Sequence, residues 1–96
     1  MKPLDYTTVI ATRNRPEALL LSIPRMLNQS RPPSQLVVVD SSDDHSLCQD
    51  AVKKAVGDSG VDLTVIAGQR GLTLQRNQGL DLVKHPIVFF LSLIHI

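Results

Sequence analysis

The side chains of this sequence that could do chemistry are concentrated in three polar segments, each directly after an apolar run. The first segment begins at Thr12, the second at Asp40, and the third, which is glycine-rich, at Gly68. Arginine guanidinium groups pair with phosphates, and an ionised aspartate can accept hydrogen bonds from the ring N–H of a base or from ribose hydroxyls. A phosphate or a base could therefore dock at these segments. The candidate residues in and just after them are Thr12, Arg13, Asn14, Arg15, Asp40, Gly71, Arg76 and Asn77.

Each of these residue types also fits a structural role. Thr12 or Asn14 could cap the helix that follows, and Asp40 could close a turn. Residues 42–44 fit the cap and first turn of the next helix, where acidic side chains are favoured. Arg76 could be a solvated residue on a helix face. Residue type alone is compatible with both roles.

The composition is that of a globular protein. Hydrophobic residues make up 43% of the 96-residue chain and charged residues 20%, which excludes disordered and low-complexity classes. The net charge of +1 lacks the excess positive charge that is typical of proteins that bind duplex nucleic acid. The single cysteine, Cys48, cannot form an internal disulfide, so we interpret it as a buried, inert thiol in a reducing compartment. His45 and His85 have no evident partners and are assigned no metal or catalytic role.

Four short apolar runs rich in β-branched residues predict the strands of a sheet. Longer stretches with helical character separate them. Alternation of strand and helix is typical of an α/β protein with a parallel sheet, covered on both faces through right-handed crossovers. We therefore expect a three-layer sandwich with four parallel strands. The four runs are Thr7 to Ala11, Leu36 to Val39, Leu63 to Ala67, and Ile87 to Leu91.

Three helices are expected between these runs. The first spans Pro16 to Gln29, and Pro24 should turn it into a kinked helix or two short pieces. The second runs from about Asp44 to Val56, and the third from about Thr73 to Val83. The expected details are Ser42 or Asp43 as the cap of the second helix, Leu47, Ala51, Val52 and Ala55 on its inner face, and Leu74, Leu80 and Val83 along one side of the third.

A ligand is expected at the loops that follow the strands. Open parallel sheets bind ligands at the carboxyl ends of their strands, at the point where the strand order reverses. The three polar segments all follow predicted strands, so the fold should bring them to one edge. The arginines expected to converge there are Arg13, Arg15, Arg70 and Arg76.

Four segments taken together resemble a known family. Their order and spacing are those of the amino-terminal half of family 2 glycosyltransferases, and the resemblance covers about Thr7 to Leu91. It implies a Rossmann-like GT-A fold and the transfer of a sugar, with inversion, from a nucleoside diphosphate sugar to an acceptor. The segments are VIATRNRPE at residues 9–17, LVVVDSS at residues 36–42, Gly71 with RNQG at residues 76–79, and IVFFL at residues 87–91.

The resemblance also implies roles for individual residues. Thr12 and Asp40 match the threonine and the strand-end aspartate that hold the base, and the arginine that matches Arg76 lies close to the nucleotide. The sequence departs from the family at Arg13, where a tyrosine is common, so the choice of base is open. It departs again at Ser41, often a second aspartate, which leaves a secondary contact open.

The last predicted strand lacks the metal-binding motif that the resemblance implies. In the family this strand ends in Asp-x-Asp, whose carboxylates bind the Mn²⁺ or Mg²⁺ that neutralises the diphosphate. Here residues 92–96 follow, which resemble translated adapter sequence, and no carboxylate comes after Asp81. We expect residues 1–91 to be the amino-terminal part of a glycosyltransferase 2-like domain and residues 92–96 to be a non-native tail. The metal is expected for a full-length parent protein, its ligands are absent from this chain, and the chain alone is expected to be inactive.

Two other functions also fit the residues. A receiver-type signalling module has a similar sheet, and Asp40 with Asp43 and Asp44 superficially resembles its acidic pocket. The arginines in the neighbouring loops have the wrong sign for the magnesium ion of such a pocket. A nucleotide-binding module without catalysis is the third interpretation.

The expected partners follow from the resemblance and the composition. They are a nucleoside diphosphate sugar and an unknown acceptor, either a glycan, a lipid or a protein, with no nucleic acid. No apolar run reaches the roughly 20 residues of a membrane span, and no secretory signal opens the sequence. We therefore expect a cytoplasmic location, with the cytoplasmic face of the membrane as the alternative for the parent protein.

Overall fold

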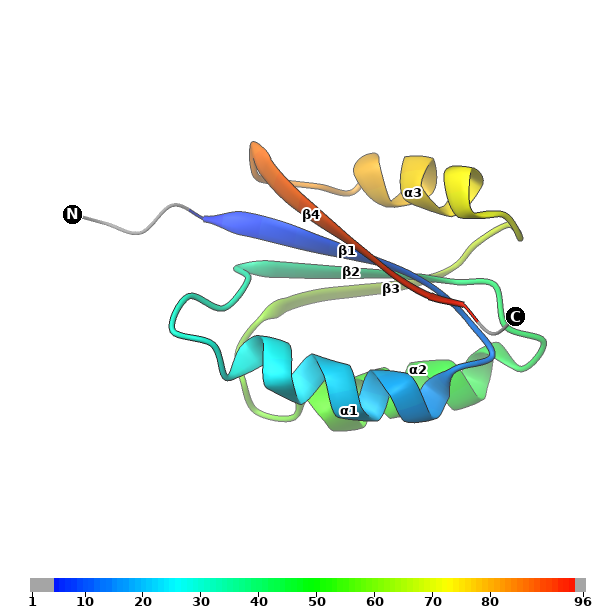
Figure 1. Ribbon diagram of the computed structural model, residues 1–96, viewed down its shortest axis with the longest axis horizontal. Helices are drawn as coiled ribbons and strands as arrows, with labels where there is room; N and C mark the ends of the chain where they lie inside the picture. The colour runs from blue at the N-terminus through cyan, green and yellow to red at the C-terminus, as the bar shows by residue number, and fades with distance from the viewer. Residues whose placement is uncertain (1–4, 95–96) are drawn as a thin grey trace.

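The computed structural model describes residues 5–94, in which strands and helices alternate as the sequence predicts. The elements are β1 (Tyr6–Arg13), α1 (Pro16–Leu27), β2 (Gln35–Asp40), α2 (His45–Val56), β3 (Asp62–Ala67), α3 (Leu72–Leu80) and β4 (Ile87–Ile94). The four strands form a single sheet in the order β3-β2-β1-β4, and every neighbouring pair is parallel. Helices α1 and α2 cover one face of the sheet and α3 covers the other (Figure 1). The expected α/β sandwich of three layers is confirmed.

The strand order reverses at β1. The chain steps from β1 to β2 to β3 in one direction, and β4 then pairs with the other side of β1. Such a reversal separates the loops on either side of it and opens a place for a ligand at the carboxyl ends of the strands. The expected non-native tail falls partly on this last strand, because residues 92–94 continue β4, whereas residues 95–96 lie outside the described residues.

The core lies on both faces of the two central strands. All six residues of β2 are buried, as expected for a parallel strand that is covered on both sides. One cluster packs Ile10 and Val38 against α1 and α2, and a smaller one packs Val9 and Val37 on the face that α3 covers. Successive side chains of β1 and β2 point to opposite faces of the sheet, so the apolar run of each strand contributes to both core clusters.

Helix α1 is one continuous helix of 12 residues with Pro24 inside it, so the expectation of two short pieces is wrong. Pro24 is exposed and begins the last turn, so the one hydrogen bond that its missing N–H removes lies near the end of the helix. The Asn28 N–H donates to the carbonyl of Pro24 at 3.0 Å and closes the helix. The expected cap is also absent: the cap position is Arg15, without a side-chain hydrogen bond, and Pro16 follows it in the first turn.

Helix α2 begins one residue later than expected. Its cap is Asp44, whose carboxylate accepts from the backbone N–H groups of Ser46 and Leu47, so the expected caps at residues 42 and 43 are wrong. The inner face carries Cys48 with Ala51 and Val52, and Cys48 is buried as predicted. Leu47, expected inward, is 58% exposed.

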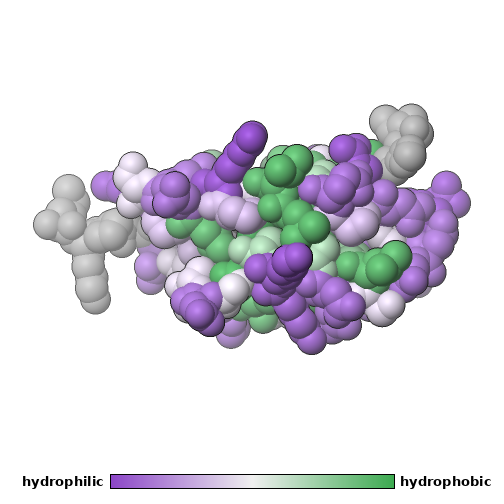
Figure 2. Space-filling view, turned by 90° about the horizontal axis from the view of Figure 1, so that it is seen from below, coloured by the Kyte–Doolittle hydropathy of each residue, from purple (hydrophilic) through white to green (hydrophobic). Residues whose placement is uncertain are grey.

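The outer face of α1 and α2 carries exposed leucines. Figure 2 shows this side of the molecule, with apolar groups gathered across its middle and hydrophilic groups around them. Leu20, Leu21 and Leu47 are the large apolar side chains of the two helices that remain exposed. The core lies beneath these leucines. Because their side chains are largely exposed, they contribute little to the stability of the fold.

Helix α3 packs on the sheet through small and polar residues. Its buried residues are Gln75 and Gly79, whereas Leu74 and Leu80 are 47% and 45% exposed. The expected extension to Val83 is also wrong, because the helix ends at Leu80. Packing decides this face: a Cβ added to Gly79 would overlap the Cγ1 of Val9, so the glycine lets the helix backbone approach the sheet.

We expect Gly79→Ala to destabilise the fold. Overpacking a core costs about 1–3 kcal/mol, and Val9 is fully buried and cannot move aside freely. The upper end of this range applies because the added Cβ would overlap the Cγ1 of Val9. Alanine recovers about 1 kcal/mol of helix propensity, so the net loss in the free energy of unfolding should be about 2 kcal/mol. Urea unfolding measures it.

Thr73→Ala is the matched control, since Thr73 is exposed on the same helix. It should change the free energy of unfolding by about 0.5 kcal/mol or less. Wild-type stability of Gly79→Ala would contradict the proposed close approach of α3 to β1.

Candidate functional site

The structure brings Thr12 and Asp40 together at the carboxyl edge of the sheet. They are register partners across β1 and β2, and both are at most 1% exposed. The hydroxyl of Thr12 donates to the carbonyl of Leu93 at 2.9 Å, which ties β1 to β4. The backbone N–H of Ser41 donates to the carbonyl of Thr12 at 3.0 Å. The end of each strand is therefore fixed by its neighbours.

The carboxylate of Asp40 organises the start of the second loop. Its Oδ1 accepts from the backbone N–H and the hydroxyl of Ser42, and its Oδ2 lies 2.8 Å from Nδ1 of His45. Burial, and after it the charge of Asp40, raises the pKa of the Cys48 thiol. The three contacts from Ser42 and His45 therefore occupy most of the roughly four acceptor sites of this carboxylate. The assignment of no partner to His45 is therefore wrong, because the five-residue separation gave no signal for a contact that the turn into α2 creates.

The first two loops are joined through Asp43. Its carboxylate accepts from Arg13 at 3.0 Å and from the amide of Asn14 at 3.2 Å, and its backbone N–H donates to Oδ1 of Asn14 at 3.0 Å. Hydrogen bonds from Asn14 and Arg13 lower the pKa of Asp43 below its usual value. Asn14 has a positive φ of 54°, a conformation that asparagine tolerates better than most residues. The result is a rigid junction between the two predicted nucleotide-binding loops.

The four arginines expected to converge have different partners. Arg13 pairs with Asp43, and the charge of Arg70 also lowers the pKa of Asp43. Arg15 pairs with Glu17 at 2.8 Å. The guanidinium carbon of Arg76 lies 5.6 Å from the ring centroid of Phe90. The structure therefore gathers two of the four arginines around one carboxylate and holds Arg76 between α3 and β4.

The remaining predicted residues lie on α3. Gly71 is the cap position of α3 and has φ 133°, a conformation that favours glycine. Its carbonyl accepts from the backbone N–H of Gln75 at 2.9 Å. Asn77 is exposed, and its carbonyl accepts from the N–H of Asp81.

Gln75 belongs to this edge of the sheet, although it was not among the residues predicted from the sequence. This side chain is 1% exposed, and its amide Nε2 donates to the carbonyls of Thr12 and Val39 at 3.0 and 2.8 Å. One feature of the sequence could have identified Gln75: it lies four residues before Gly79 and therefore on the same face of the helix. A polar residue on the face that a glycine marks as close-packed must be hydrogen-bonded.

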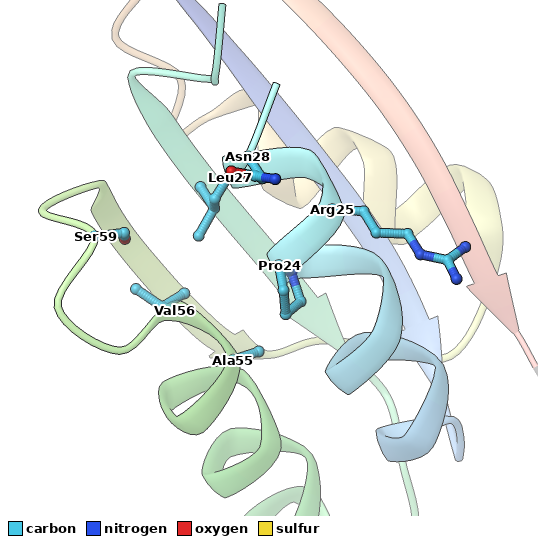
Figure 3. A pocket seen from close by; sticks show the side chains of 7 residues that line it. All are labelled: Pro24, Arg25, Leu27, Asn28, Ala55, Val56 and Ser59. Carbon is cyan, nitrogen blue, oxygen red and sulfur yellow. The ribbon is translucent and has the colours of Figure 1, made fainter. Parts of the chain in front are cut away.

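A small cavity lies beside these residues. It has a volume of about 200 Å³ and is formed by the first loop, the second loop and the start of α2. A larger groove of about 490 Å³ lies at the other end of the helices, between the carboxyl ends of α1 and α2 (Figure 3). Its Arg25 side chain points away from the neighbouring helix in this view, and none of the predicted nucleotide-binding residues lines it. The cavity at the carboxyl edge is lined by Asn14, Pro16, Ser42, Asp44, Leu47 and Cys48.

The described residues do not fit a divalent metal. Mg²⁺ and Mn²⁺ prefer oxygen ligands, above all carboxylates, and β4 ends in Ser92, Leu93 and Ile94. Within residues 5–94 no group of three or more His, Cys, Asp or Glu side chains could hold an ion. Asp40, Asp43 and Asp44 hold His45, Arg13 and the first turn of α2, so they do not form the acidic pocket of a receiver module.

Comparison with known proteins decides the family. The model of glycosyl transferase family 2 matches residues 7–92, a range that includes β1 almost completely, most of β4 and every predicted nucleotide-binding residue. The chain belongs to glycosyl transferase family 2. No curated protein matches this family 2 chain. Its parallel sheet with three helices is consistent with part of a Rossmann-like GT-A domain.

The stability of this glycosyltransferase domain should fall at high pH because of Cys48. Burial, followed by the charge of Asp40, raises the pKa of Cys48 from 9.0 to about 12. The folded thiol keeps its proton where the unfolded thiol loses it, so this contribution to stability is complete below pH 9 and is lost as the pH rises toward 12. Between pH 8 and 10.5 the loss should reach about 2 kcal/mol.

Urea unfolding of the wild type and of Cys48→Ala at the two pH values tests this. The variant lacks the thiol, so its free energy of unfolding should decline less over the same interval. Parallel declines of the two proteins would show that Cys48 is not responsible.

Proposed function

We propose that this chain binds the nucleoside diphosphate part of a sugar donor at the carboxyl edge of β1 and β2. The observation that carries the proposal is the register pairing of Thr12 with Asp40, beside the strand where the sheet order reverses, in a chain of glycosyl transferase family 2. Family membership gives the class of reaction, the transfer of a glycosyl group. We propose a nucleoside diphosphate sugar as the donor and a glycan, a lipid or a protein as the acceptor.

We propose that the base of the nucleotide binds at the second loop, which begins at Asp40. Asp40 is buried, and its carboxylate is covered by three hydrogen bonds from Ser42 and His45. Because Asp40 is only 1% exposed behind these groups, a ring N–H or a ribose hydroxyl has to replace one of them to reach the carboxylate. His45 and Ser42 are the partly exposed donors, so they are the ones a ligand can displace. Cys48 stays in place because it is buried in the core.

The diphosphate is proposed to lie toward α3. Arg76 is exposed on this helix and rests on the ring of Phe90, which orients the guanidinium without neutralising it. The backbone of Gly71, without a side chain, allows a ligand to approach the first turn of the helix. Arg70 adds a second positive charge near Asp43. These contacts fit an anion better than a neutral ligand.

The proposal includes no step through a metal. Residues 5–94 lack a group of side chains that could hold the Mn²⁺ or Mg²⁺ expected for the parent protein. We propose that this chain binds its ligand through the residues named above. That the chain alone has no transferase activity stays a prediction.

No helix in residues 5–94 has the length and apolar character to cross a membrane. A cytoplasmic setting is likewise proposed.

Asp40→Asn should weaken nucleoside diphosphate binding about ten-fold or more. A charge-assisted hydrogen bond contributes roughly 1.5–3 kcal/mol, and asparagine keeps the size of the side chain but not its charge. Calorimetry or NMR titration with UDP, GDP, ADP, CDP and dTDP measures the affinity. Asp50→Asn, which removes an exposed carboxylate on α2, is the control and should bind as the wild type does. Wild-type affinity of Asp40→Asn would discard Asp40 as a base-binding residue.

Arg76→Ala should weaken binding of the diphosphate more than binding of the bare nucleoside. The guanidinium is proposed to pair with phosphate oxygens, which the nucleoside lacks. The ratio of the two dissociation constants should rise about ten-fold relative to the wild type. Arg25→Ala removes an exposed arginine of the distant groove and should leave the ratio unchanged. Equal losses for both ligands would place Arg76 away from the phosphates.

A further inference from the structure

Gln75 joins α3 to the two strands that carry the proposed nucleotide site. Its Nε2 donates to the carbonyl of Thr12 at 3.0 Å and to the carbonyl of Val39 at 2.8 Å. Its Oε1 accepts from the hydroxyl of Ser41 at 3.3 Å. Thr12 and Val39 belong to neighbouring strands, so a single amide group bridges β1 and β2 at their carboxyl ends.

These contacts reach the residues around the proposed base site directly. Thr12 is itself a predicted base-binding residue, and its carbonyl also accepts from the N–H of Ser41. Val39 and Ser41 are the chain neighbours of Asp40 on either side. The amide of Gln75 therefore holds Asp40 from both sides without touching its carboxylate.

We propose that Gln75 is the positioning residue of the nucleotide site, because its buried amide fixes the ends of β1 and β2 relative to each other and to α3. This inference rests on the proposed function of the same site. A change at Gln75 should shift Thr12 and Ser41 and thereby weaken nucleotide binding, although Gln75 is 1% exposed and does not meet the ligand.

The chain contains a matched control at the opposite edge of the sheet. Gln35 is also fully buried, and its Nε2 donates to the carbonyl of Leu82 at 2.8 Å. Its Oε1 accepts from the hydroxyl of Thr7 at 2.7 Å and from the N–H of Lys84 at 2.9 Å. Gln35 thus has the same residue type, a comparable burial and the same number of hydrogen bonds as Gln75. It differs in lying at the amino end of β2.

The experiment compares Gln75→Met with Gln35→Met in the 96-residue chain. Methionine approximates the shape of glutamine and removes all three hydrogen bonds, so both variants should melt at lower and similar temperatures. The dissociation constant for the tightest wild-type ligand among UDP, GDP, ADP, CDP and dTDP is measured well below both melting temperatures. It should rise at least ten-fold for Gln75→Met and less than two-fold for Gln35→Met. Wild-type affinity of Gln75→Met, or equal weakening by both variants, would overturn the proposal.

Amide hydrogen exchange gives a second measurement that needs no ligand. In Gln75→Met the backbone N–H groups of Ser41 and Gly68, which donate to the carbonyls of Thr12 and Asp40, should exchange at least ten-fold faster than in Gln35→Met. In Gln35→Met the acceleration should appear at Lys84. If the wild type binds none of the five nucleotides, the proposed function fails for this chain, while exchange still tests the positioning. Unchanged exchange at Ser41 and Gly68 would overturn it.

If Gln75→Met does not fold, Gln75→Asn replaces it in the experiment. Gln75→Asn keeps a polar side chain that is one methylene too short to reach both carbonyls, and Gln35→Asn is its control. The same difference in affinity and in exchange is expected between this pair. Identical behaviour of the two asparagine variants would count against the proposal in the same way.

Discussion

Burial of the β1 and β2 ends on both faces of the sheet is the constraint on which the rest of the structure depends. Thr12 and Asp40 lie there out of contact with water, and a buried polar group without a partner costs about 1–3 kcal/mol or more. Every buried side-chain nitrogen and oxygen in residues 5–94 has a hydrogen-bond partner. The two strands can therefore be covered by helices only if the loops and α3 supply donors at this edge.

That requirement determines how the loops are built. Ser42 and His45 turn toward Asp40, which leaves the cap of α2 to Asp44. Asp43 is then free to join Arg13 and Asn14 at the surface. Surface ion pairs contribute little to stability by themselves, so this junction acts mainly by defining the shape of the first two loops. The proposed base contact exchanges one internal donor of Asp40 for a donor on the ligand.

The same constraint explains why α3 faces the sheet with an amide and a glycine. An apolar residue in place of Gln75 would leave the carbonyls of Thr12 and Val39 without this donor. Gly79 allows the backbone of the helix to come near enough for the amide to reach them. The leucines of α3 are consequently turned outward and remain partly exposed. Close packing at one glycine and hydrogen bonding at one glutamine thus depend on each other.

The sequence by itself determined the sheet, the order of elements and the family. Apolar runs rich in β-branched residues mark strands whatever surrounds them, and the polar segments after Ala11 and Val39 mark the carboxyl edge. Tertiary structure decided which polar side chains pair there. Gln75 meets Thr12 across 63 residues of chain, and His45 meets Asp40 because the chain turns into α2 between them. Hydrophobic periodicity places the leucines on the inner face of α3, whereas the spacing of Gln75 and Gly79 marks another face. The tertiary structure decided between the two faces, because the buried carbonyls of two neighbouring strands require a donor at that place.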